Sequence, residues 1–110
     1  MTNEEFLSTL KEGDFITAQH NQDKAKLIAC FDKRYKSYTS YHCVCTKFFI
    51  GYVSGIIRVG LPFVCGDEVT TLRKATMDEI FTLIDALRKK GYRYNRKKKI
   101  VINKETYESN

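Results

Sequence analysis

Some stretches of this chain of 110 residues have the hydrophobic pattern of strands and others have that of helices, and together they predict an α+β fold. Stretches rich in β-branched, aromatic and other apolar residues are bounded by polar turns, which is typical of strands. We expect such strands at residues 14–18, 26–31, 38–49 and 69–72. Residues 50–64 add one or two short strands, broken at Gly51, Gly55 and Gly60. Glycines this frequent favour sharp bends or bulges, as at the corners of a small barrel.

The clearest single element is an amphipathic helix over residues 76–90. Thr76 and Glu79 form a capping box at its start, and Gly91 follows its basic last turn as a suitable C′ residue. The helical spacing predicts a buried face made of Met77, Ile80, Phe81, Ile84 and Leu87, with Leu83 beside them. Residues 92–95 and 100–102 then predict a β-hairpin across the turn at residues 95–99.

A second capping box, Thr2 with Glu5, predicts a short N-terminal helix. Its docking face would carry Phe6, Leu7 and Leu10. The expected fold is therefore α+β. It comprises a bent antiparallel sheet or small β-barrel of about five or six strands, the short N-terminal helix, one main helix (about 76–90) and a basic C-terminal β-hairpin.

Length and composition add that residues 1–110 form a single domain, without a linker or an internal repeat. The start of the chain is acidic where a secretion signal is basic. The longest mostly apolar stretch, residues 48–64, is interrupted and too short to span a bilayer. We therefore expect a cytoplasmic protein with no membrane partner; homo-oligomerisation is left open.

The net charge of +6 is concentrated near the C-terminus. Nine of the 19 lysines and arginines lie in residues 88–104, without one acid among them. The rest of the chain holds ten positive residues against 13 acids. Such asymmetry indicates an acidic partner, either nucleic acid or an acidic protein surface.

The predicted hairpin is the strongest binding candidate. Its cations can meet phosphates and its tyrosines can stack on exposed bases. The candidate residues are Arg93, Arg96, Lys97, Lys98, Lys99, Tyr92 and Tyr94. The competing interpretation is structural: the charges complement a helix C-terminus, solvate a hairpin tip and protect a sheet edge, and an aromatic residue anchors the hairpin by packing.

Metal and catalytic sites have weaker support. His42, Cys43 and Cys45 are close in sequence, but alternation along a strand points His42 away from the two thiols, and no second cysteine pair completes a zinc site. Paired acids such as Asp78 and Glu79 stand at helix starts or turns, where capping explains them. We therefore predict free thiols, no metal, no cofactor and no catalytic residues, and hence a protein that is not an enzyme.

Residues 73–80 (Arg-Lys-Ala-Thr-Met-Asp-Glu-Ile) and residues 87–95 (Leu-Arg-Lys-Lys-Gly-Tyr-Arg-Tyr-Asn) resemble a recurring tail. It is found in small uncharacterised proteins of Bacteroidetes and their phages. Those proteins share an Arg-x-Ala-Thr-x-x-Glu helix start, Gly-Tyr-x-aromatic-Asn and a basic strand; their aromatic residue is usually tryptophan, where this chain has Tyr94. The resemblance covers about 30 residues. It implies a phage or mobile-element origin, in the host cytoplasm or the virion, and brings no activity or catalytic residue.

Two functional hypotheses follow. The first is a non-enzymatic, small phage-type accessory protein that binds nucleic acid or another polyanion through the basic hairpin. The alternative is a protein-interaction module, such as a virion component or an inhibitor of a host defence protein.

Overall fold

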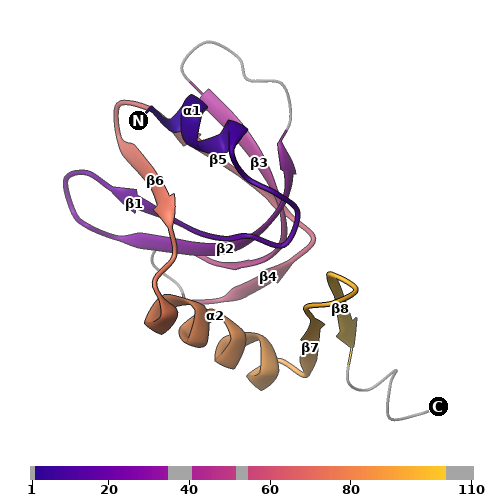
Figure 1. Cartoon of the computed structure of the whole chain (residues 1–110). Coiled ribbons are helices and arrows are strands. Elements are labelled where there is room, and N and C mark those ends of the chain that lie inside the picture. The colour runs from indigo at the N-terminus through magenta and orange to yellow at the C-terminus, as the bar shows by residue number, and fades with distance from the viewer. Residues whose placement is uncertain (1, 35–40, 52–54, 104–110) are drawn as a thin grey trace.

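Two helices and eight strands occupy the part of the chain that the computed structural model describes, residues 2–34, 41–51 and 55–103. Six strands form one antiparallel sheet with the order β4-β3-β2-β1-β6, and β5 pairs with β3 beside β4 (Figure 1). They are β1 (Phe15–His20), β2 (Lys26–Arg34), β3 (Tyr41–Ile50), β4 (Ile57–Val59), β5 (Pro62–Gly66) and β6 (Thr70–Lys74). A separate hairpin contains β7 (Tyr92–Asn95) and β8 (Ile100–Asn103), and the helices are α1 (Asn3–Ser8) and α2 (Met77–Lys89).

This architecture confirms the predicted α+β class, with a bent antiparallel sheet, a short first helix, one main helix and a C-terminal hairpin. The first three residues of the strand expected at 38–49 lie outside the described residues. The sheet is not closed into a barrel. One reason is visible at β6, where the Asn3 amide accepts from the backbone N–H of Leu72 (3.0 Å) and donates to the carbonyl of Thr70 (2.9 Å). The side chain of Asn3 thus takes up edge groups that another strand would use.

Alternation along β1 and β2 gives the sheet two buried faces. Ile16 pairs with Ala29 on one face, and Phe15 pairs with Cys30 on the other. The first face carries a core cluster with the α1 residues Phe6 and Leu7, which also includes Ile16, Ala18, Leu27, Ala29, Phe31, Val44, Phe63, Cys65 and Leu72. The second face packs against α2 and the hairpin. Its core cluster contains Ile28, Cys30, Phe48, Ile57, Leu83 and Leu87.

Strand β3 contributes to both clusters because its register shifts. Phe48 pairs with Cys30, whereas Thr46 pairs with Phe31, so Lys47 is an extra residue between them. Val44 consequently lies in the first cluster and Phe48 in the second, although both are even-numbered. The Lys47 ammonium lies 2.8 Å from a carboxylate oxygen of Glu12.

Both predicted capping boxes are present, at Thr2 with Glu5 and at Thr76 with Glu79. The predicted buried face of α2 is partly wrong. Met77 and Phe81 are 62% and 63% exposed, whereas Leu83 and Leu87 are fully buried. The reason is Glu79, which is buried against the sheet and turns the helix so that Met77 and Phe81 point outward. Neither helix is long and apolar enough to cross a membrane, as far as the described residues go.

Candidate functional site

The hairpin is held on the second core cluster by Tyr94. Its ring makes edge contacts with Phe48, at 5.1 Å between centroids, and with Phe15, at 6.1 Å. Burial raises the pKa of the Tyr94 hydroxyl, and a hydrogen bond with the Cys30 thiol raises it further. Burial also raises the pKa of Cys30, to about 11. Tyr94 is therefore accounted for by packing, and the half-buried Tyr92 packs against the same cluster.

The tip of the hairpin is a tight turn organised by Asn95. Its side-chain oxygen accepts from the backbone N–H groups of Lys97 and Lys98, both at 3.0 Å, and its carbonyl accepts from that of Lys99 at 2.7 Å. These three backbone donors are used within the turn. What Lys97 and Lys98 offer to a partner is therefore their exposed side chains, carried on a fixed backbone.

Two other cations of the turn lean on the body of the protein. The Arg96 guanidinium lies over the Phe15 ring, 5.4 Å from its centroid. The Lys99 stem passes over Gly13, where an added Cβ would lie 3.4 Å from Lys99 Cδ and 3.3 Å from the Tyr94 hydroxyl. Gly13 has φ +95°, so glycine is favoured there by conformation as well as by space. Because Gly13 has no side chain, Tyr94 and Lys99 can pack closely against it, and the hairpin turn lies against the body of the protein.

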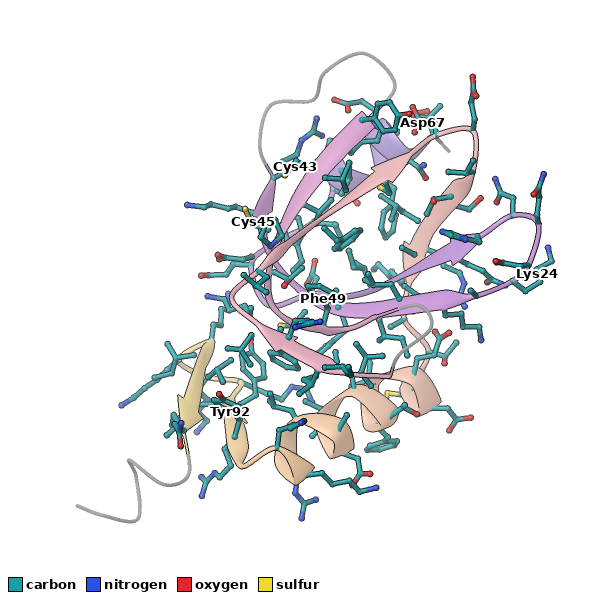
Figure 2. The ribbon with its side chains drawn as sticks, turned by 180° about the vertical axis from the view of Figure 1, so that it is seen from behind. Lys24, Cys43, Cys45, Phe49, Asp67 and Tyr92 are labelled. Carbon is teal, nitrogen blue, oxygen red and sulfur yellow. The ribbon has the colours of Figure 1, made fainter. Side chains whose placement is uncertain are left out.

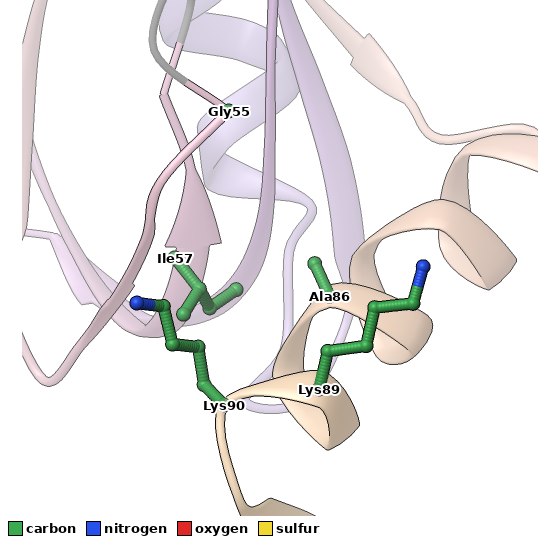
Figure 3. Close-up of a pocket in the computed structure, with 5 residues that line it drawn as sticks. All are labelled: Gly55, Ile57, Ala86, Lys89 and Lys90. Carbon is green, nitrogen blue, oxygen red and sulfur yellow. The ribbon is translucent and has the colours of Figure 1, made fainter.

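The end of α2 adds three exposed cations next to the hairpin: Arg88, Lys89 and Lys90. Lys89 and Lys90 border a shallow hollow of about 270 Å³, which is also lined by Gly55, Ile57 and Ala86 (Figure 3). Lys89 also forms an exposed ion pair with Asp85, at 3.0 Å, one helical turn earlier. Exposed pairs of this kind are weak, so Lys89 remains able to meet another anion.

We call these side chains together the basic surface: Arg88, Lys89, Lys90, Arg93, Arg96, Lys97, Lys98 and Lys99. All eight are exposed, and no acid occurs between residues 86 and 103. The end of α2 and the hairpin, which carry these cations, lie next to each other and away from the turn that holds Lys24 (Figure 2).

A second charged cluster, the Glu79 network, is buried instead. Glu79 is 7% exposed and accepts from two nitrogens of Arg73, at 2.7 and 2.8 Å. It also accepts from the Thr17 hydroxyl at 2.9 Å and lies 3.2 Å from the Lys26 ammonium. The Arg73 guanidinium, helped by the other donors, holds the pKa of Glu79 well below its usual range. The carboxylate of Glu79 thus has a structural role, because it is hydrogen-bonded or ion-paired to Arg73, Thr17 and Lys26.

Sequence reasoning identified Glu79 only as a cap and missed this network. The available signal was Arg73, six residues earlier in the Arg-x-Ala-Thr-x-x-Glu pattern. Arg73, Thr76 and Glu79 all take part in one hydrogen-bonded unit, because Thr76 and Glu79 form the capping box and Arg73 binds the Glu79 carboxylate. Arg73, Thr76 and Glu79 therefore have a folding role.

His42, Cys43 and Cys45 are not brought together. His42 is 4% exposed, and its Nε2 lies 2.9 Å from a carboxylate oxygen of Asp67. Cys43 and Cys45 are half-buried on the opposite side of β3, as strand alternation predicts (Figure 2). Within the described ranges, no group of three or more histidine, cysteine or acidic side chains is arranged to hold a metal ion.

Comparison with known proteins gives no information about this site. No protein-family model, no curated protein and no solved structure matches this chain.

Proposed function

We propose that the protein is a small, non-enzymatic accessory protein of phage type that binds nucleic acid or another polyanion through the basic surface. The observation that carries the proposal is the hairpin tip, where Lys97 and Lys98 are exposed on a turn whose backbone donors are already used. The resemblance of residues 73–95 to phage proteins supports the origin. Glu79 is ion-paired with Arg73 and does not support an acid–base centre. His42 contacts Asp67 and lies apart from the thiols of Cys43 and Cys45, which does not support a metal centre.

Several features make phosphate the natural partner of this surface. Its cations are lysine ammonium and arginine guanidinium groups on a stretch of chain without acids. Such a stretch can bind the closely spaced phosphates of a nucleic acid. Tyr94 packs in the core and does not form part of the proposed surface. Binding through the tip would therefore depend on charge and strongly on salt. Contact with about four phosphates of duplex DNA corresponds to a slope of roughly −4 in a plot of log K against log salt, and contact with four phosphates of a single strand to roughly −3.

The test is a salt titration of the full chain with a labelled nucleic acid, followed by fluorescence anisotropy. Replacing two tip lysines (K97Q/K98Q) should reduce the magnitude of the slope by about 2, because two phosphate contacts are lost. The matched control, K24Q/K33Q, removes two exposed lysines from β2 and the turn before it, and should leave the slope unchanged. Equal slopes for both variants and the unchanged protein would rule out the tip as the contact.

A protein-interaction module is the second candidate, favoured by the outward-facing pair Met77 and Phe81 on α2. Because these residues are four apart, they form one apolar strip on the side of the helix away from the sheet. A protein complex formed there should survive nuclease and high salt and be lost in the M77Q/F81Q variant. A complex that nuclease or salt dissolves would support the polyanion proposal instead.

A further inference from the structure

A groove borders the basic surface where the hairpin turn approaches the junction of β6 and α2. Its volume is about 240 Å³, and its walls include Phe15, Lys74, Ala75, Ile80 and Arg96. These residues come from β1, β6, α2, the link between β6 and α2, and the hairpin turn. The groove therefore exists only when the hairpin is docked on the sheet.

The groove combines two cations with three apolar side chains. Lys74 and Arg96 reach it from segments that are far apart in sequence, while Phe15, Ala75 and Ile80 provide the apolar walls. Arg96 is placed over the Phe15 ring, 5.4 Å from its centroid. Exposed nucleobases stack on arginine guanidinium groups, and the same guanidinium can bind a phosphate.

The acids around the groove leave it modestly positive. Asp14 contributes the single carboxylate of the lining, and one of its oxygens accepts from the backbone N–H of Lys11 at 2.8 Å. Glu79, in the first turn of α2, is neutralised by Arg73. The groove thus has two cations for one acid, and the tip lysines Lys97 and Lys98 follow Arg96 directly in the chain. A ligand that matches both parts carries a flat ring and flanking phosphates.

We infer that the groove takes one base of a single-stranded nucleic acid, while the basic surface holds the adjacent phosphates. This inference rests on the proposed function and narrows its substrate class. A duplex keeps its bases paired inside and presents phosphates, so it can meet the tip lysines but cannot fill the groove. The groove is smaller than the ~300 Å³ at which small-molecule pockets begin, so it suits a single base of a longer strand.

The test compares three labelled probes on the full chain by fluorescence anisotropy: an oligodeoxycytidine of about 12 nucleotides, an abasic strand of the same length, and a duplex. The base-bearing strand should bind about tenfold more tightly than the abasic strand, which is the effect expected for one stacked base. R96K keeps the charge but loses the planar fork, and should bring this ratio close to one. K97Q/K98Q should weaken both strands and keep the ratio.

A second variant, A75L, fills the groove without changing any charge, and circular dichroism establishes that each variant is folded. Equal affinity of the unchanged protein for base-bearing and abasic strands would overturn the inference and leave the proposed function standing. The inference is also overturned if folded R96K and A75L both retain the full preference, because the base then binds elsewhere. Failure to bind any of the three probes would overturn the inference together with the nucleic-acid part of the proposed function, and would leave only another polyanion as the partner.

Discussion

The Glu79 network and the basic surface are both built from charged side chains, but they differ in burial. Glu79 is buried and meets Arg73, Lys26 and Thr17 at 2.7–3.2 Å. The cations of the basic surface are exposed, and the ion pair of Lys89 with Asp85 lies at the surface as well. A buried carboxylate must be paired for the chain to fold, whereas exposed cations contribute little to stability. The first cluster is therefore explained by folding, and the second requires another explanation.

The largest expected effect is on the Glu79 network. Replacing Glu79 by glutamine leaves the Arg73 guanidinium without its anion and weakens the capping box, so the variant should lose about 3 kcal/mol of unfolding free energy. Urea denaturation followed by circular dichroism measures this loss. D78N removes an exposed acid from the same helical turn and should cost well under 1 kcal/mol. Equal losses in the two variants would contradict the role given to Glu79.

The same network predicts how stability depends on pH. Since Glu79 has a depressed pKa in the folded protein, its contribution is fully present above the unfolded carboxyl pKa of about 4.3. As pH falls below this value, the unfolded chain takes up the proton first, so stability decreases. Urea midpoints measured between about pH 7 and 3 should fall less steeply for E79Q than for the unchanged protein. Parallel profiles would show that Glu79 is not the carboxylate responsible.

A smaller effect is expected at Tyr94, which joins the basic surface to the core. Y94F keeps the ring contacts with Phe15 and Phe48 but removes the hydroxyl beside Cys30. The loss of one buried hydrogen bond should cost about 1 kcal/mol in urea denaturation, with nucleic-acid affinity unchanged. A large loss of affinity with no change in stability would instead make Tyr94 a contact residue.

Much of the local structure could be predicted from the sequence because it depends on neighbouring residues. Thr76 and Glu79 mark a helix start within four residues, and Asn95 closes the hairpin turn over the next four. The orientation of α2 could not be predicted in this way, because it depends on Glu79 meeting Thr17, 62 residues away. Periodicity alone assigned Met77 and Phe81 to the core, since it cannot show which of two overlapping stripes faces the sheet.

For the candidate site too, some features could be predicted from the sequence and others could not. The excess of positive charge is a property of composition and could be read directly from residues 88–104. The burial of Tyr94 and the position of Arg96 over Phe15 depend on the hairpin docking against β1 and β3. Those contacts join segments about 50–80 positions apart, so no local pattern contains them. The groove was likewise invisible in the sequence, because its walls come from five separate segments.

The central claim is that the tip cations serve binding and not folding. The most direct measurement determines the unfolding free energy and the nucleic-acid affinity of K97Q/K98Q in the same buffer. We expect stability within about 0.5 kcal/mol of the unchanged protein, because both lysines are exposed. Affinity should fall by about tenfold or more at low salt, because two phosphate contacts are lost. Unchanged affinity, or a loss of stability that accounts for the weaker binding, would contradict the claim.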